Sequence, residues 1–338
     1  MDKKIVLTGD RPTGKLHLGH YVGSLRNRVK MQESNEYEMY IMIADMQAFT
    51  DNANKPEKRK KSVIHVAIDN LSVGINPEKA TLFVQSSIPE LSELTMYYMN
   101  LVTVNRAKRN PTIKSEIKER GFSDSVPVGF LAYPISQAAD ITAFNATHVP
   151  VGDDQLPILE QDREIVKSFY KIYGKTLTMP EPILSKNKNS RRLPGLDGKN
   201  KMSKSLNNCI YLSDDTKTVT AKVMSMYTDP NHLKIEDKGD TKNNPVFLYL
   251  DALCKDRKKF DELKKGYEQG GVGDVIIKNY LIDVVEETLI PIREKRKYYE
   301  SHLDEVYTIL KNGSVKAERI AHETLKRVRK AVGVEYYN

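Results

Sequence analysis

Short apolar runs alternate with longer amphipathic stretches through the first half of the chain. The short runs predict buried strands, at 5–7, 37–44, 81–85 and 148–151. The longer stretches carry apolar residues at helical spacing, at 18–29, 55–74, 90–104, 129–144 and 156–173. Strands that alternate with helices imply right-handed crossovers and a parallel sheet with helices on both faces. We therefore predict an α/β fold with a Rossmann-like parallel-sheet domain.

The remaining segments follow other patterns. Residues 105–127 are irregular and charged, which indicates an insertion at the edge of the sheet domain. Residues 185–206 are rich in Lys, Arg, Asn, Ser and Gly and predict a mobile loop. Beyond that loop the spacing is helical, for example at 217–227, 246–254, 274–299 and 314–332. We therefore expect a sheet domain at 1–206 and a helical domain at 207–338.

The composition fits a protein that folds in water. Charged residues make up 29% of the chain, and the mean hydropathy is −0.52. No apolar run approaches the roughly 20 residues that span a bilayer, and the N-terminus shows no secretion signal. Cys209 and Cys254 lie far apart, which argues against a disulfide framework or a cysteine zinc site and indicates the reducing cytoplasm. The net charge of +8 fits a polyanionic partner, although many basic proteins bind none.

The segment from Thr8 to His20 predicts a phosphate site. It follows the first strand, contains the chain breakers Gly9, Pro12 and Gly14, and leads into a helix. Such a turn brings backbone N–H groups together with the positive end of a helix dipole. One interpretation is the P-loop of a kinase-like protein, G-x-x-x-x-G-K-[ST]. The match fails at Leu16, which lacks a hydroxyl for Mg²⁺, and at Pro12, which lacks an N–H group.

A second interpretation rests on two histidines in the same segment. His17-Leu18-Gly19-His20 resembles the HxGH signature of class I aminoacyl-tRNA synthetases, and both rings lie on roughly one face of the first helical turn. Downstream, Lys201-Met202-Ser203-Lys204-Ser205 matches the second signature of that family, KMSKS. Taken alone, this lysine cluster indicates only a solubilising loop. Two signatures in this order favour the synthetase interpretation over the P-loop.

Further motifs narrow the resemblance. The segments that resemble bacterial tryptophanyl-tRNA synthetases are 8–14, 76–77, 83–86, 133–140, 149–155 and 194–198. The resemblance covers essentially the whole chain. The main alternative is the tyrosyl-tRNA synthetase family, which shares the fold and both signatures. Its tyrosine on the first strand, which binds the substrate phenol, has no counterpart in Val6-Leu7-Thr8-Gly9, whereas Gln137 is closer to the tyrosine enzymes.

The resemblance implies a two-step reaction, in which ATP activates L-tryptophan and tRNA(Trp) then receives it. Catalytic roles would fall to His17, His20, Lys201, Lys204 and Arg11. Imidazole and ammonium groups can donate to the phosphates as charge develops on the leaving pyrophosphate. The nucleotide would be bound by residues of the turn, the insertion, the end of the fourth strand and the lysine loop: Arg11, Pro12, Thr13, Gly19, His20, Lys114, Gly152, Asp153, Asp154, Leu193, Lys201, Met202, Ser203, Lys204 and Ser205.

The indole N–H of tryptophan can only donate a hydrogen bond, so its pocket needs a buried acceptor. Asp140, near the end of an apolar helix, stands at the matching family position. The resemblance places Gly19 against the adenine, where its small size gives room. It places other residues around the amino acid: Leu7, Ile43, Gln47, Val149 and Val151 on the ring, Tyr133 and Gln155 on the α-amino group, and Gln137 in the pocket wall. Plain core packing is the alternative for each.

The resemblance also implies partners. Mg²⁺ should accompany ATP and bind its phosphate oxygens, since no set of His, Cys and Asp suggests a dedicated metal site. In the family the sheet domain binds ATP and the amino acid, the helical domain reads the anticodon, and the enzyme is a homodimer. Lys and Arg at 255–265 and 293–297 are candidate contacts to tRNA phosphates, with solvated helix faces as the alternative.

Overall fold

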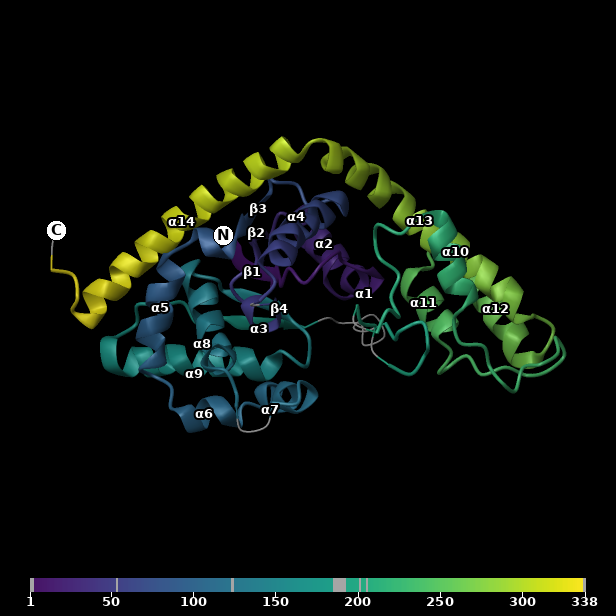
Figure 1. The fold of residues 1–338 in the computed structure, drawn as a ribbon, viewed down its shortest axis with the longest axis horizontal. Helices are drawn as coiled ribbons and strands as arrows, with labels where there is room; N and C mark the ends of the chain where they lie inside the picture. The colour runs from purple at the N-terminus through teal and green to yellow at the C-terminus, as the bar shows by residue number, and fades with distance from the viewer. Residues whose placement is uncertain are drawn as a thin grey trace.

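Five parallel strands form one sheet in the computed structural model (Figure 1). The structure describes residues 3–52, 54–122, 125–184, 193–200, 202–204 and 206–336. The strands lie in the spatial order β3-β2-β1-β4-β5, with bounds β1 (Lys4–Asp10), β2 (Tyr37–Ile43), β3 (Ala80–Val84), β4 (His148–Val151) and β5 (Glu181–Leu184). The four predicted strands are confirmed, and β5 adds an edge strand that we did not predict.

The sheet separates two hydrophobic cores, because successive strand residues face opposite sides. Ile43 of β2 packs into the core that contains α4 (Pro56–Ser72). Met42 faces the other core, which is built with the helices α5 (Glu90–Met99), α8 (Val128–Ala143) and α9 (Leu156–Tyr173). A parallel sheet covered by helices on both faces is the Rossmann-like α/β arrangement predicted from the sequence.

The helix after β1 begins with a change of winding. α1 (Leu18–His20) is followed by a π-helical turn, Tyr21–Leu25, and then by α2 (Arg26–Glu33). Leu18 and Val22 are buried, as the predicted helical spacing requires. Single π turns inside helices are frequent at functional sites, and this one directly follows the two histidines of the first signature.

Short turns follow the next two strands as well. α3 (Phe49–Asn52) comes shortly after β2, and a 3₁₀ turn, Gln85–Ser87, comes directly after β3. Both turns stand beyond the carboxyl ends of parallel strands, the edge at which ligands bind in such folds.

The charged segment 105–127, predicted to be irregular, is partly helical instead. It contains α6 (Val104–Arg109) and α7 (Pro111–Glu119). The Asn110 side-chain oxygen accepts a hydrogen bond from the Thr112 N–H at 3.0 Å and so caps α7. A cap followed by proline at the first helical position can start a short helix that shows little apolar periodicity.

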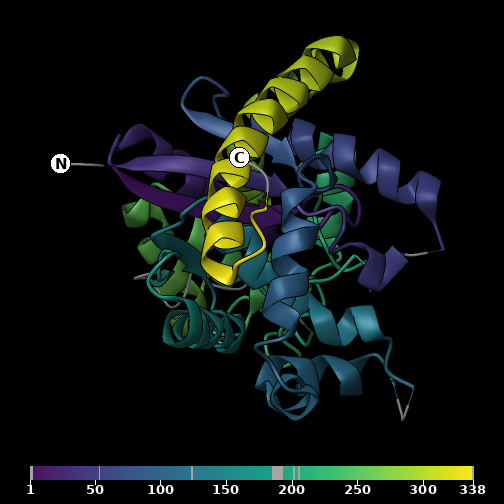
Figure 2. The ribbon, with the colours of Figure 1, turned by 90° about the vertical axis from the view of Figure 1, so that its left-hand side faces the viewer.

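The second half of the chain is helical, as predicted, with α10 (Thr216–Met224), α11 (Pro245–Leu253), α12 (Arg257–Gln269), α13 (Asp274–Ser301) and α14 (Leu303–Val332). α13 runs beside α10 and α11, and α14 returns across the sheet beside β3 and α5 (Figures 1 and 2). The predicted domain boundary at 206–207 stays a prediction. It assigns α14 to the helical domain, yet α14 lies against β3 and α5 of the sheet part and not with α10–α12. None of the helices that the structure describes is long and apolar enough to cross a membrane.

Candidate active site

A cavity of about 270 Å³ lies at the carboxyl ends of β1 and β4. These two strands are neighbours where the strand order reverses, and open parallel sheets bind ligands at such points. The lining residues come from strand ends, α7, α8 and the connections between them: Leu7, Thr8, Gly9, Arg11, Met42, Ala44, Gln47, Glu116, Tyr133, Gln137, Asp140, Ile141, Val149, Pro150, Val151 and Gln155. All residues predicted to surround the amino acid are among them except Ile43.

Asp140 lines this cavity from α8 and is only 1% exposed. Gln85, which directly follows β3, donates from Nε2 to both carboxylate oxygens at 2.9 and 3.0 Å. Gln47 Nε2 lies 3.5 Å from Asp140 Oδ2. Burial raises the pKa of Asp140 to about 7, while the bonds from Gln85 and Gln47 oppose that rise. The cavity therefore contains a fixed acceptor. Gln85 belongs to the segment 83–86 that resembles the family, but we predicted no role for it in the pocket, although its place at a strand end indicated one.

A second carboxylate in the cavity was also missed. Glu116 of α7 accepts a hydrogen bond at Oε2 from the Tyr133 hydroxyl at 3.0 Å. Burial, together with the Glu116 carboxylate, raises the pKa of Tyr133 above its ordinary value, so the phenol stays neutral. Glu116 lies in the segment predicted to be irregular, and no motif marks it. A carboxylate and a phenol oxygen side by side can hold an ammonium group.

The two histidines of the first signature lie at the start of α1, with ring centroids 3.9 Å apart. His17 Nδ1 accepts a hydrogen bond from the Gly19 N–H at 3.1 Å, and His20 Nδ1 accepts one from the His17 N–H at 3.2 Å. A neutral imidazole that accepts at Nδ1 carries its proton on Nε2. The backbone thus sets the tautomer of both rings, and each can donate to an anion from Nε2.

Two described residues of the second signature lie against the first signature and the glycine-rich turn before it. Met202 Sδ accepts a hydrogen bond from the Gly19 N–H at 3.3 Å. Lys204 Nζ donates to Thr13 Oγ1 at 3.2 Å and to the Gly14 carbonyl at 3.0 Å. Burial lowers the pKa of Lys204 to about 8. The structure therefore places a cation directly at the glycine-rich turn.

Gly19 is confined by both signatures. A Cβ atom at this position would lie 2.9 Å from His17 Cε1 and 3.1 Å from Met202 Sδ. Its predicted role was to give room to adenine, and that role stays a prediction. In the structure, the absence of a side chain allows the His17 ring and Met202 to approach the helix backbone.

The chain that leaves the lysine loop pairs with the first signature. The Leu18 N–H donates to the Ile210 carbonyl at 2.9 Å, and the Leu212 N–H donates to the Leu16 carbonyl at 3.0 Å. This antiparallel contact anchors the far end of the loop beside the turn. It explains how two signatures so far apart in the sequence meet at one edge of the sheet.

Comparison with known proteins agrees with this geometry. Residues 2–290 match the family model for class I tRNA synthetases (W and Y). The chain belongs to this class I tRNA synthetase family. It is similar to tryptophan–tRNA ligases of Clostridium longisporum (58% identical, covering 100% of this chain and 99% of the relative) and Streptococcus mutans (57% identical, covering 100% of both). The crystal structure of Campylobacter jejuni tryptophanyl-tRNA synthetase, complexed with ADP and tryptophan, superposes with a TM-score of 0.85 at 32% identity, covering 97% of this chain and 99% of that one.

One residue that we predicted in the amino acid pocket of this synthetase, Ile43, lies on the other face of the sheet. Its side chain is fully buried in the core on the α4 side of the sheet. Met42 and Ala44, the residues before and after it, line the cavity instead. Because strand side chains alternate between the two faces, an assignment that is one residue out of register selects the wrong face.

The remaining residues predicted for the nucleotide lie around the turn, α7 and the end of β4. The Asp154 carbonyl accepts a hydrogen bond from Thr112 Oγ1 at 2.7 Å, which ties the connection after β4 to α7. Ser203 donates from its N–H to Asn208 Oδ1 at 2.7 Å. Some of these residues are solvent-accessible and others are buried: Arg11, Lys114, Gly152, Asp153 and Asp154 are exposed, whereas Pro12 and Leu193 are buried. Lys201 and Ser205 lie outside the described residues.

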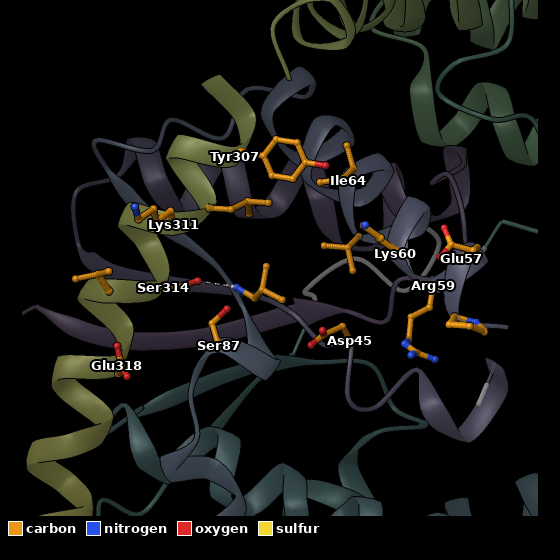
Figure 3. Close-up of a pocket in the computed structure, with 15 residues that line it drawn as sticks. Asp45, Glu57, Arg59, Lys60, Ile64, Ser87, Tyr307, Lys311, Ser314 and Glu318 are labelled. Atoms are coloured by element: carbon orange, nitrogen blue, oxygen red, sulfur yellow. Dashed lines mark hydrogen bonds between the residues drawn. The ribbon is translucent and has the colours of Figure 1, made fainter. Parts of the chain in front are cut away.

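A second cavity, of about 670 Å³, lies between α4, the end of β3 and α14 (Figure 3). Among the described residues, none of those predicted for the substrates lines it. Ser314 of α14 lines this cavity and accepts a hydrogen bond from the Val84 N–H at 3.3 Å (Figure 3). None of the described residues of the two signatures lines it either.

The candidate tRNA contacts divide into two kinds. Lys258 and Lys259 at the start of α12 are exposed, and so are Lys295 and Lys297 of α13. Arg296 is only 2% exposed, so it is not a surface contact for a phosphate. The charge pattern along α13 could not show this, because the burial of Arg296 depends on a partner elsewhere in the chain.

Proposed function

We propose that this chain is a tryptophan–tRNA ligase: it activates L-tryptophan with ATP and transfers it to the 3′ end of tRNA(Trp). The observation that carries the proposal is Asp140, a fixed and buried acceptor in a cavity that is also lined by Gly9 and Arg11, at the start of the turn that leads into the first signature. The printed names of the relatives support the same substrate. The indole N–H needs an acceptor of this kind.

Activation needs positioning and charge stabilisation more than it needs a base. The tryptophan carboxylate is ionised at neutral pH and attacks the α-phosphorus of ATP, and pyrophosphate leaves. His17 and His20 donate from Nε2 to the phosphates. Lys204 moves from Thr13 and Gly14 to the leaving pyrophosphate, and Lys201 is proposed to join it.

Different residues of the cavity would contact the two ends of the amino acid. Asp140 accepts from the indole N–H, while Glu116, Tyr133 and Gln155 surround the α-ammonium group. Leu7, Val149 and Val151 pack on the ring. A site built around one buried hydrogen bond should reject phenylalanine strongly, because phenylalanine leaves Asp140 without its partner.

Transfer needs the tRNA to reach both halves of the molecule. A ribose hydroxyl of the terminal adenosine attacks the carbonyl carbon of the tryptophanyl adenylate, and AMP leaves. The helical part would read the anticodon, with the exposed lysines of α12 as phosphate contacts.

Mg²⁺ is proposed to enter as the ATP complex, held by phosphate oxygens, which suits a cation that keeps several waters. Among the described residues, His, Cys, Asp and Glu nowhere gather in a set of three or more that could hold a metal ion. A homodimer and a cytoplasmic location remain predictions of the family resemblance, and the molar mass in solution tests the first of them.

The test is ATP–pyrophosphate exchange with each of the twenty amino acids, followed by aminoacylation of tRNA(Trp). We expect exchange with tryptophan alone and charging of tRNA(Trp). Exchange with tyrosine but not tryptophan would replace this proposal with the tyrosine activity, and no exchange with any amino acid would exclude both.

A further inference from the structure

The turn of the first signature rests on two consecutive residues of α4. Asp69 and Asn70 are both fully buried beneath it. The Leu16 N–H donates to Asp69 Oδ2 at 2.8 Å, and Asn70 Nδ2 donates to Asp10 Oδ2 at 3.2 Å. One helix therefore holds both ends of the turn, and Asp69 holds the end that leads directly into His17.

The other oxygen of Asp69 is bound from the far half of the chain. Arg296 of α13 donates from Nη1 to Asp69 Oδ1 and from Nη2 to His65 Nδ1, the latter at 3.2 Å. Arg296 also forms an ion pair with Glu300, Nε to Oε1 at 3.0 Å. Burial raises the pKa of Asp69 to about 6, and the charge of Arg296 opposes this rise. The guanidinium thus helps to keep the Asp69 carboxylate ionised.

Such a pair is a poor source of stability, because desolvation of two charges offsets most of their attraction. Its geometry is specific, however. The Asp69 carboxylate bonds to Arg296 through one oxygen and to the Leu16 N–H through the other, so a single side chain links α13 to the residue before His17.

A second connection from α13 reaches the same segment. Arg293, three residues before Arg296, donates from Nη1 to the Asp214 carbonyl at 3.0 Å. Asp214 Oδ2 accepts from the Tyr211 N–H at 2.8 Å. Tyr211 lies in the stretch that pairs with Leu16 and Leu18. Helix α13 is therefore linked to the first signature by two routes. One runs through Asp69 to Leu16, and the other runs through Asp214 to Tyr211.

From this arrangement we infer that Asp69 and Arg296 form a positioning relay, through which α13 sets Leu16, and with it His17 and His20, for the reaction with ATP. Neither residue touches the reacting atoms. The relay rests on the proposed function and deepens it, since it makes the ATP half of the site depend on the placement of the helical part. The amino acid cavity has no such link to α13 among its lining residues in the described chain.

The experiment measures kcat, and KM for ATP and for tryptophan, in the exchange reaction for Arg296→Gln, Asp69→Asn and the double variant. We expect each single variant to lose roughly tenfold in kcat/KM for ATP, with KM for tryptophan within about twofold of wild type. The double variant should lose no more kcat/KM for ATP than the less active single variant, because either single substitution already breaks the contact between the two residues. Arg296→Lys, which keeps a cation beside Asp69, should recover most of the loss.

Arg329→Gln is the control for loss of an ion pair between distant segments, here a partly exposed one. Arg329 of α14 donates to Glu93 of α5 at 2.7 and 2.5 Å, so it also joins a C-terminal helix to the sheet part, but away from the turn. It should leave all three kinetic parameters within about twofold. The relay is refuted if the Arg296 and Asp69 variants keep normal ATP parameters, lose equally for ATP and tryptophan, or match Arg329→Gln.

A second variant and the wild-type activity distinguish a loss of folding from a loss of the relay. If Arg296→Gln fails to fold, Asp69→Asn carries the same comparison, because its side-chain oxygen still accepts from the Leu16 N–H. A wild-type chain without tryptophan-dependent exchange refutes the proposed function. An active wild type with unaffected variants refutes the relay alone.

Discussion

The amino acid cavity and the phosphate turn share one edge of the sheet, yet they are built from different parts of the chain. The cavity is lined by residues between Leu7 and Gln155, and Gln85 fixes its buried carboxylate, Asp140. The turn is completed by Lys204 and by the stretch that follows it, which arrive from beyond the lysine loop. One half is complete within the first part of the chain, and the other is assembled from distant segments.

The two halves differ in how far they are preorganised for their ligands. Burial and two hydrogen bonds from Gln85 hold Asp140 in place before any ligand arrives. Lys204 instead occupies the turn through bonds to Thr13 and Gly14, which we propose it exchanges for bonds to phosphate oxygens. Substitutions in the cavity should therefore act on the amino acid alone, whereas those at the turn should act on ATP.

The largest effect is expected at the fixed half. Asp140→Ala removes the proposed acceptor for the indole N–H and the acceptor for Gln85 Nε2, so kcat/KM for tryptophan should fall on the order of 10³-fold or more. Exchange kinetics measure it, with KM for ATP and the thermal unfolding midpoint as internal controls. Near-normal tryptophan activation would remove Asp140 from the pocket.

A smaller loss is expected at the phosphate half. His20→Ala removes one imidazole donor and the acceptor for the His17 N–H, and kcat of exchange should fall about 10²-fold with little change in KM for tryptophan. His148→Ala is the control, because His148 begins β4 at the opposite edge of the sheet. An equal loss in both variants would show that the effect is structural.

Lys204 gives the comparison a pH dependence. Its pKa of about 8 lies below the ordinary value of lysine because the side chain is buried. Bound phosphates favour the ammonium form and raise this pKa, so ATP binding at pH 8.5 should take up protons. Calorimetry in two buffers of different ionisation enthalpy measures the uptake.

Lys204→Met should abolish that uptake and lower kcat roughly tenfold. Proton release by the wild type, or the same uptake in the variant, would contradict the assignment of Lys204 to the phosphates. Asp140→Ala serves as the control, since it leaves the turn intact and should keep the uptake.

The sequence could predict the part of the site that is local in the chain better than the part assembled from distant segments. The turn between β1 and α1 is local, so strand, breakers and helical spacing predicted it directly. Only the pairing of two signatures indicated that the lysine loop belongs with the turn, and the contact of Lys204 with Thr13 was not itself predicted. The relay from Arg296 to Asp69 links positions 227 residues apart, and no pattern within either helix marks it.

The errors have local causes. Ile43 was placed on the wrong face by the family resemblance, and the strand is too uniformly apolar for its own pattern to correct the register. β5 was missed because four residues that include a proline give a weak strand pattern. Gln85 and Glu116 were missed because their roles depend on partners that only the fold supplies, Asp140 and Tyr133.

The smallest effect is expected at Gln137, the cavity residue that most favours the tyrosine alternative. Its side chain lines the cavity beside Asp140. Methionine has a similar length and fills irregular space, so Gln137→Met should change kcat/KM for tryptophan by less than about threefold. Tyrosine-dependent exchange should stay undetectable in both forms, because Asp140 and the shape of the cavity select the substrate. If the wild type activates tyrosine and Gln137→Met does not, the amide is a specificity determinant, and the cavity is less completely fixed by Asp140 than the comparison of the two halves implies.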